Sequence, residues 1–345
     1  MNPILSISAQ NKTESPQSWQ QELANAIRSP AELLAALDLT PGQLPAFFNG
    51  GDSFPLRVPF SFVSKMKKGD PNDPLLRQVL PLDKENNFTR GYLSDPVGDL
   101  SASKTPGLLH KYHGRALMIT TGACAIHCRY CFRRHFPYNQ QNAASNEWDD
   151  ALAHITNDTS INEVILSGGD PLALSDQRLN TLLEQLEQIP HLKRIRIHTR
   201  LPVAIPQRIT DALLSLLSNC RFTLIMVIHV NHANEIDSAL HQSLKRLQSI
   251  PGITLLNQSV LLKGVNDSSE TLVALSEALF ASGVLPYYLH LLDKAQGTAH
   301  FDVPVACATR LLAEVHAQLP GYLVPRLALE EAGAQGKTLI TNSMI

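Results

Sequence analysis

The stretch that decides the fold is RALMITTGACAIHCRYCFRR, residues 115–134. It begins with the apolar run 116–120, which is typical of a buried strand. A loop containing Cys124, Cys128 and Cys131 follows. Because thiolates are soft ligands, cysteines this close together can bind one metal centre from a single loop. The stretch therefore predicts a strand that leads into a ligand loop.

The alternation of apolar and amphipathic runs continues downstream and predicts the fold class. From the second strand onward the strands recur about every 30 residues, which is the period of βα units in a parallel sheet. Six units predict an α/β fold, a partial (βα)6 barrel resembling part of a TIM barrel. The expected strands are 116–120, 163–166, 194–198, 222–229, 254–262 and 285–292, and the expected helices are 178–189, 207–217, 236–250 and 269–282.

The two ends of the chain differ from this central region. Residues 1–100 contain short helical patterns at 19–26 and 31–37, interrupted by prolines, and predict a helical and irregular region packed on the barrel. We therefore expect three parts. They are the N-terminal region over 1–100, the barrel core over 101–300 and a short C-terminal segment over 301–345.

Composition restricts the class of protein. Hydrophobic residues form 44% of the sequence and charged residues 17%, which favours a folded core over disorder. The net charge of -2 argues against nucleic-acid and membrane partners. No apolar run is long enough for a membrane span, and residues 1–30 lack a signal core, so we expect a cytoplasmic protein. Cys220 and Cys307 lie far from the ligand loop and are expected to pack in the core.

The spacing of the loop cysteines favours an iron–sulfur cluster. Three thiolates can hold a cuboidal cluster and leave one iron without a protein ligand. The alternative is a zinc site, for which His127 or His135 would supply the fourth ligand. Structural zinc sites usually contain a second spaced pair of ligands, and this loop lacks one. The interpretation as a cluster is therefore the stronger one.

A glycine motif follows the second expected strand. Ser167, Gly168, Gly169 and Asp170 form the sequence SGGD, and adjacent glycines let a backbone approach a ligand closely. Loops that follow barrel strands meet at one face, so this loop is expected beside the cysteine loop. Together the two loops resemble the radical S-adenosylmethionine (SAM) superfamily. The resemblance implies a [4Fe–4S] cluster that cleaves SAM to a 5′-deoxyadenosyl radical, with SGGD in SAM binding.

A narrower resemblance covers residues 92–338. The sequence is similar to the lysine 2,3-aminomutases, which use pyridoxal 5′-phosphate together with SAM. The resemblance implies an isomerase that converts (S)-α-lysine to (R)-β-lysine, with L-lysine as substrate and a flavodoxin- or ferredoxin-type electron donor. The motifs that carry it are CRYCFRR (128–134), SGGD (167–170), IPQR (205–208), NQSVLL (257–262), GVND (264–267) and PYY (286–288).

The same resemblance assigns cofactor contacts. Lys337 would bind pyridoxal phosphate covalently, and Arg115 would bind its phosphate, for which a guanidinium is suited. His229, at the end of the fourth expected strand, and Gln258 are also assigned to cofactor binding.

Three further residues are assigned to the substrate. Arg133 would bind the carboxylate of lysine, and Asp293 would receive its distal ammonium. Glu330 stands seven residues before Lys337, where the family usually has a second aspartate. Two carboxylates at this end favour lysine over glutamate, because they would repel an acidic side chain.

Other positions depart from the family pattern. Ala334 and Gln335 interrupt the glycines that precede Lys337. Ser268 stands where clostridial-type members have a zinc-binding cysteine, and no cysteine follows Cys307, so we expect no C-terminal zinc extension. This shorter form resembles the bacterial branch that makes (R)-β-lysine for elongation factor P. The resemblance implies a functional link to that factor and its lysyl ligase.

Several alternatives stay open. A catabolic aminomutase of lysine or of another amino acid would share the same motifs. A radical SAM enzyme without pyridoxal phosphate would make Lys337, Arg115 and Asp293 incidental. A non-catalytic metal-binding or translation-associated adaptor would not cleave SAM. The sequence does not fix the oligomeric state, and a homo-oligomer is possible.

Overall fold

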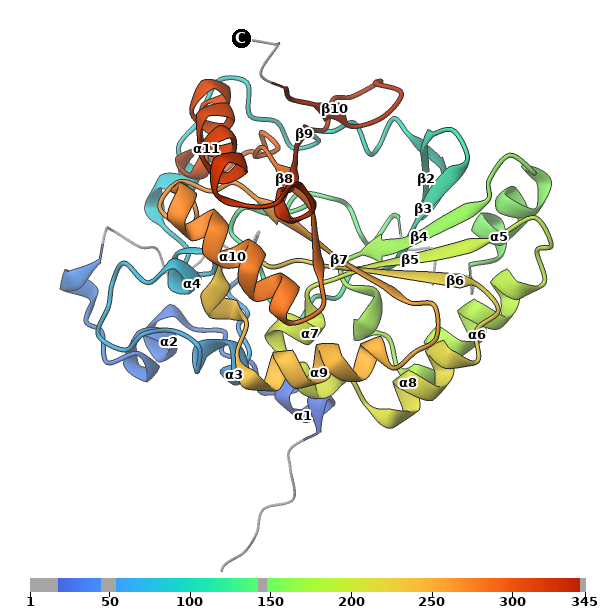
Figure 1. The fold of residues 1–345 in the computed structure, drawn as a ribbon, viewed down its shortest axis with the longest axis horizontal. Helices are drawn as coiled ribbons and strands as arrows, with labels where there is room; N and C mark the ends of the chain where they lie inside the picture. Colours follow the sequence, from blue (N-terminus) through green and yellow to red (C-terminus); the bar gives the residue numbers. More distant parts are fainter. Residues whose placement is uncertain (1–17, 45–53, 142–147, 342–345) are drawn as a thin grey trace, which may run out of the picture.

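The computed structural model describes residues 18–44, 54–141 and 148–341, which contain one sheet with strands in the order β1 to β10 (Figure 1). Neighbouring strands from β3 to β9 pair in parallel. The edge strands β1 and β10 lie at opposite ends of this order, so the sheet is an open barrel. The parallel strands are β3 (Arg115–Thr121), β4 (Glu163–Gly168), β5 (Arg194–Thr199), β6 (Thr223–Ile228), β7 (Thr254–Val260), β8 (Leu285–His290) and β9 (Arg326–Leu329).

The predicted partial barrel is confirmed. Each of the six expected strands is present, with ends shifted by at most two residues. The sequence missed β9, which comes from the C-terminal segment and adds one more parallel strand beside β8. It also missed the antiparallel additions β1 (Ser103–Thr105), β2 (Leu108–Tyr112) and β10 (Thr338–Leu339), which are too short to show a clear period.

Helices between the strands cover the outer side of the sheet (Figure 1). Four begin at a side chain that accepts a hydrogen bond from a backbone N–H of the first turn. These N-caps are Ser175, Thr210, Asp237 and Ser268. The helices are α5 (Asp149–Asn157), α6 (Asp176–Glu187), α7 (Leu201–Ala204), α8 (Asp211–Ser218), α9 (Ser238–Gln248), α10 (Ser269–Ala281) and α11 (Val305–Gln318). Of the four expected helices, the one at 207–217 starts later, because Pro206–Arg208 forms a 3-10 turn.

The N-terminal region is helical and irregular, as expected. It contains α1 (Trp19–Ala24), α2 (Pro30–Ala36), α3 (Phe60–Val63) and α4 (Pro74–Arg77). Its apolar side chains belong to the same buried cluster as those of the barrel. The division of the chain at residues 100 and 300 stays a prediction.

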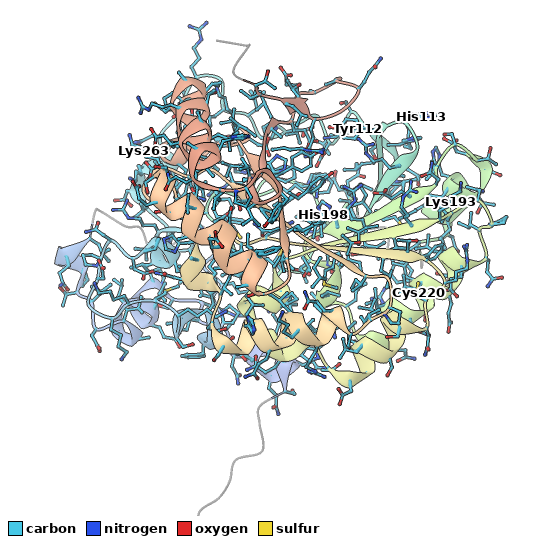
Figure 2. All side chains as sticks on the ribbon, in the orientation of Figure 1. Tyr112, His113, Lys193, His198, Cys220 and Lys263 are labelled. Carbon is cyan, nitrogen blue, oxygen red and sulfur yellow. The ribbon has the colours of Figure 1, made fainter. Side chains whose placement is uncertain are left out.

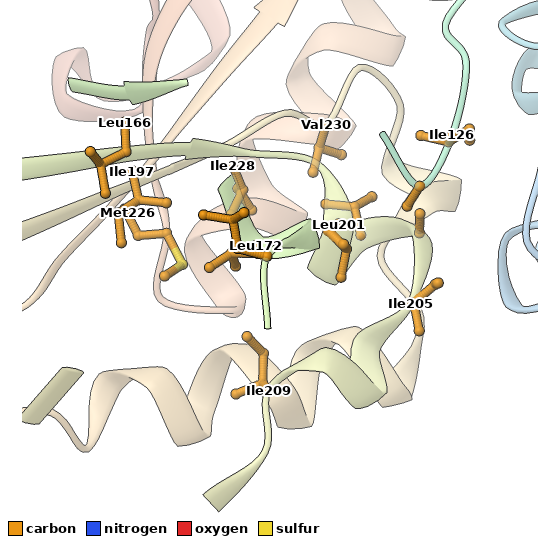
Figure 3. Close-up of a cluster of buried hydrophobic side chains, with 14 of the residues drawn as sticks. Ile126, Leu166, Leu172, Ile197, Leu201, Ile205, Ile209, Met226, Ile228 and Val230 are labelled. Carbon is orange, nitrogen blue, oxygen red and sulfur yellow. The ribbon is translucent and has the colours of Figure 1, made fainter. Parts of the chain in front are cut away.

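The hydrophobic core fills the space between the sheet and its covering helices. Figure 3 shows part of it, in which Ile197 of β5 and Met226 of β6 lie beside Leu172 and Leu201. Along β5, Ile195 and Ile197 are buried in this core, and the alternate residues lie on the opposite face. The helix-facing side of the sheet is therefore apolar, which leaves the other face for polar groups.

Within the described residues, no helix is both long and apolar enough to cross a membrane.

Candidate active site

The cysteine loop and the glycine loop lie against each other at the carboxyl ends of β3 and β4. The Gly169 N–H donates to the Thr121 carbonyl at 2.7 Å, and the Asp170 N–H donates to the Ala123 carbonyl at 2.8 Å. A Cβ at Gly169 would lie 2.3 Å from the Ala123 oxygen. Gly168 has a φ of +114°, which favours glycine. The glycines are therefore required for packing against the cysteine loop, whatever ligand they bind.

The three loop cysteines lie close enough to affect one another's ionisation. Burial raises the pKa of Cys124 well above its usual value, and Cys131, Asp170 and Cys128 add to the rise. Burial together with Cys128 raises the pKa of Cys131 to about 11. Thiolates at this place therefore need a cation to stabilise them. Three soft donors on one loop fit an iron–sulfur cluster, which supplies that positive charge.

The two histidines considered as zinc ligands have other contacts. The Nδ1 atom of His127 lies 2.8 Å from the Pro55 carbonyl, and the Nε2 atom of His135 lies 3.2 Å from the Gln296 carbonyl. These contacts favour a structural role for both rings and weaken the zinc alternative.

Arg200 places a buried positive charge beside the cysteine loop. Its guanidinium donates to the Cys128 sulfur at 2.7 Å and to the Tyr130 hydroxyl at 2.6 Å. It also donates to Gln78 at 2.7 Å and to Glu235 at 2.9 Å, which fix its orientation. Arg200 therefore stabilises negative charge on Cys128. Arg200 directly follows β5, and no motif in the sequence marks it as a site residue.

Three histidines at strand ends face the interior of the barrel. His198 is the penultimate residue of β5, His229 follows β6 and His290 ends β8. Their Nε2 atoms are buried and have no hydrogen-bond partner. Burial lowers the pKa of His229 to about 3 and lowers the pKa of the other two well below the usual value. Figure 2 shows His198 near the middle of the molecule. Unpartnered polar atoms at this depth indicate a space in which a polar ligand can bind.

A chain of ion pairs crosses the same region. The Arg133 Nε lies 2.6 Å from Asp99, and the Lys111 ammonium lies 2.6 Å from the other Asp99 oxygen. Lys111 also pairs with Glu330 at 2.9 Å, and Glu330 pairs with Lys337 at 2.8 Å. The structure therefore connects three predicted site residues through two that the sequence did not identify.

Asp293 and Glu330 are carboxylates with opposite behaviour. Burial and the charge of Glu330 raise the pKa of Asp293 to about 7, and its Oδ1 atom has no hydrogen-bond partner. Burial also acts to raise the pKa of Glu330, but Lys337 and Lys111 lower it to about 2. Glu330 is therefore ionised and paired with two lysines, whereas Asp293 forms no ion pair within the described residues.

The remaining predicted cofactor residues are distributed around this centre. Lys337 lies 5.8 Å from the centroid of the Tyr288 ring, and Gln258 pairs with Tyr288 between β7 and β8. Arg115 is the first residue of β3, and its guanidinium lies 4.7 Å from the centroid of the Tyr112 ring. Burial raises the pKa of Tyr112, and the negative charge of Glu330 raises it further. Tyr112 therefore lies between Arg115 and the ion-pair chain.

The carboxylate of Asp170 is engaged by the protein itself. Its oxygens accept hydrogen bonds from the backbone N–H groups of Leu172, Arg200 and Leu201 and from the Thr199 hydroxyl. These donors occupy the lone pairs of both oxygens. The Asp170 side chain therefore holds the loops after β4 and β5 together. Ser167, also in the motif, accepts from Arg133 at 3.2 Å.

Comparison with known proteins identifies the family of this chain. The model of the radical SAM superfamily matches residues 118–272. An L-lysine 2,3-aminomutase of Escherichia coli is 48% identical over 327 residues, which cover 94% of this chain and 95% of that protein. The chain belongs to the lysine 2,3-aminomutase family. Members of this family are isomerases within the radical SAM superfamily.

Two further members of the family are similar to this chain over most of its length. The L-lysine 2,3-aminomutase of Haemophilus influenzae is 48% identical over 323 residues, which cover 94% of this chain and 95% of that protein. The L-lysine 2,3-aminomutase of Acetoanaerobium sticklandii is 34% identical over 321 residues, covering 93% of this chain and 77% of that protein. Of these three relatives, the two with 95% of their length covered are more similar to this chain than the one with 77% covered.

The residues that sequence reasoning missed share a cause. Asp99 lies in an irregular segment before β1, and Lys111 lies in the short strand β2, so neither has a motif around it. Lys111 and Glu330 are separated by 219 positions in the chain. His198 and His290 do carry a signal, because both lie at the carboxyl end of an expected strand.

We expect Asp293→Asn to change the pH dependence of stability. The pKa of Asp293 is about 7 in the folded protein and 3.8 ordinarily, so the folded state loses stability as pH rises between these values. The side chain keeps some exposure, so we expect the ligand-free variant to gain about 1–2 kcal/mol at about pH 8 and nothing below about pH 4. Chemical denaturation checks this, and the exposed Asp83→Asn is the control. An equal gain at both pH values would contradict it.

Proposed function

We propose that this chain is an L-lysine 2,3-aminomutase that converts (S)-α-lysine to (R)-β-lysine with a [4Fe–4S] cluster, SAM and pyridoxal 5′-phosphate. The observation that carries the proposal is the ion-pair chain between Arg133 and Lys337, with Asp293 beside it. It gathers a guanidinium, carboxylates and an amine in one region. These groups complement a molecule with a carboxylate and a distal ammonium.

The cysteine loop would hold the cluster through Cys124, Cys128 and Cys131. When bound, the cluster and SAM supply a carbon-centred radical, and pyridoxal phosphate stabilises an unpaired electron near the migrating nitrogen. The chain supplies orientation. Arg200 stabilises charge on Cys128, and the close contact of Gly169 with the Ala123 backbone holds the glycine loop beside the cluster loop.

Lys337 is proposed to bind pyridoxal phosphate covalently. It directly precedes β10, which pairs antiparallel with β9, and its ammonium lies beside Glu330. The neutral ring of His290 and the Tyr288 ring lie near its ammonium. The ionised Glu330 carboxylate accepts a hydrogen bond from the Lys337 ammonium at 2.8 Å and stabilises its charged form. Lys337 would therefore have to lose its proton to another base before the amine can act as a nucleophile. Arg115 would bind the phosphate of the cofactor.

The two ends of lysine would bind at different parts of the ion-pair chain. Arg133, held at its Nε by Asp99, has guanidinium nitrogens left for the substrate carboxylate. Asp293 lacks a cation in the ligand-free protein and would ionise when a substrate ammonium arrives. Glu330 would then share that ammonium with Asp293. Positioning both ends confines the reactive radical to one hydrogen atom of the substrate.

Lys337→Ala tests the cofactor assignment. We expect the reconstituted wild-type protein to form β-lysine and 5′-deoxyadenosine from lysine and SAM under anaerobic reduction. Lys337→Ala should lose β-lysine formation by at least about a thousandfold, because the only proposed covalent anchor is gone. Borohydride reduction followed by peptide mass analysis should find the cofactor on Lys337 in wild type alone.

The control for this experiment is Lys193→Ala, which changes an exposed lysine at the edge of the molecule (Figure 2). It should keep activity, cofactor labelling and iron content. Cofactor trapped on another lysine of the Lys337→Ala protein would move the anchor elsewhere. Absence of β-lysine from the wild-type protein, with SAM cleavage intact, would favour a radical SAM enzyme of another substrate.

Glu330→Gln tests the substrate assignment. We expect kcat/KM for lysine to fall by an amount equivalent to about 1.5–3 kcal/mol, the range for hydrogen bonds to charged groups. Glu330→Asp keeps the charge and should recover most of the activity. Pyridoxal phosphate content is measured in parallel, so that loss of cofactor is not mistaken for weaker lysine binding. Unchanged lysine kinetics in Glu330→Gln would overturn the proposed role.

We also propose that the product serves the modification of elongation factor P. Resemblance to the shorter bacterial branch supports this role. The cytoplasm would supply lysine, a flavodoxin- or ferredoxin-type electron donor and the lysyl ligase. Cells that lack this gene should lose β-lysyl mass on elongation factor P, and the wild-type gene or added (R)-β-lysine should restore it. Retention of the modification in the deletion strain would overturn the pathway but leave the aminomutase reaction standing.

A further inference from the structure

A second group of metal-ligating side chains lies away from the cysteine loop, between β2 and α5. His110 is in β2, His154 is in the last turn of α5, and Asp158 is the residue that ends that helix. One ligand atom from each residue lies within 4.8 Å of the others. The His110 Nδ1 atom is 3.7 Å from Asp158 Oδ2. The two imidazole rings are 6.1 Å apart and nearly perpendicular, at 84°.

The atoms of this group that face one another are not satisfied by the protein. The Nε2 atom of His154 is buried and has no hydrogen-bond partner. A buried ring nitrogen without a partner destabilises the folded state. The His110–Asp158 separation is longer than a hydrogen bond, so this contact does not compensate either ring.

The second carboxylate oxygen of Asp158 is held by hydrogen bonds, as is usual for metal ligands. Asp158 Oδ1 accepts from the Ser160 hydroxyl at 2.6 Å and from the Ser160 N–H at 3.1 Å, which leaves Oδ2 directed to His110. Supporting contacts of this kind hold carboxylate ligands in metal sites.

We propose that His110, His154 and Asp158 form a binding site for a divalent transition-metal cation, with Zn²⁺ as the favoured ion. Two imidazoles and one carboxylate are common zinc ligands, and a water molecule would complete a tetrahedron. Zinc–nitrogen and zinc–oxygen bonds of about 2.0–2.2 Å place ligand atoms about 3.3–3.5 Å apart. A bound cation would draw the three ligand atoms, which now lie within 4.8 Å of one another, to this spacing.

The charges around the site are compatible with a cation. Burial lowers the pKa of His110, and the charges of His154 and Lys104 lower it further. The negative charge of Asp158 acts in the opposite direction. The imidazole is therefore available as a neutral ligand. Lys104 is the nearby cation that opposes metal binding, and the Asp158 carboxylate offsets it.

The position of the site gives it a structural role. Figure 1 shows α5 and β2 on the same side of the molecule. Successive residues of a strand point to opposite faces, so His110 faces α5 while Lys111 reaches Asp99 and Glu330 in the active site. A bound cation would fix β2 to α5 and, through the same strand, hold Lys111 in place.

The test uses the reconstituted protein, in which iron occupies the cysteine loop. Zinc titration by calorimetry should show one equivalent bound, and X-ray absorption at the zinc edge should show only nitrogen and oxygen ligands at about 2.0–2.1 Å. His154→Ala and Asp158→Asn should each weaken zinc binding at least tenfold. The control is His113→Ala, an exposed histidine in the turn after β2, which should bind zinc as the wild type does (Figure 2).

The two variants separate binding from folding. Asp158→Asn keeps the size of the side chain, and circular dichroism and iron content establish that each variant is folded. A sulfur shell at about 2.3 Å would place zinc on cysteines and overturn the proposal. Equal zinc affinity in wild type and both ligand variants, or no binding by wild type, would also overturn it. Lysine turnover is measured separately, so that failure of the aminomutase assignment leaves the zinc result unaffected.

Discussion

Parallel hydrogen bonding from β3 through β9 places the carboxyl ends of these strands at one side of the sheet, and the candidate active site depends on that alignment. The cysteine loop follows β3, the glycine loop ends β4, and the buried histidines lie at the ends of later strands. A strand shifted by one residue would turn its side chains to the apolar face. The register of the sheet therefore decides which polar groups meet.

The polar groups that meet are arranged so that most charges have partners. Asp99 lies between Arg133 and Lys111, and Glu330 lies between Lys111 and Lys337. Removing Asp99 would leave Arg133 without its carboxylate, and removing Glu330 would leave Lys337 without its carboxylate. Loss of the partner of a buried charge destabilises a protein by about 3–5 kcal/mol. The chain of pairs thus holds the site in shape before any ligand binds. Asp293 is the exception, since no cation neutralises it and its pKa rises to about 7.

Strand β2 connects this network to the outside of the barrel. Lys111 reaches the interior, and its neighbour His110 faces α5. Successive residues of β2, which pairs antiparallel with β3, point to opposite faces, so one face meets the active site and the other meets a helix. The position of Lys111 is therefore coupled to the packing of β2 on α5. Interactions that fix β2 against α5 therefore also fix the ion pair between Lys111 and Glu330.

The sequence by itself determined the features that depend on local pattern. Cysteine spacing fixed the ligand loop, apolar runs fixed six parallel strands, and glycine at positions 168 and 169 identified the adjoining loop. Only the tertiary structure decided the partners of the charged groups. Glu330 lies 219 positions from its partner Lys111, and β10 has only two residues, too few to show a period. The physical reason is that periodicity and spacing record how a segment meets its immediate surroundings, whereas ion pairs across the barrel depend on the distance between side chains after the sheet has formed.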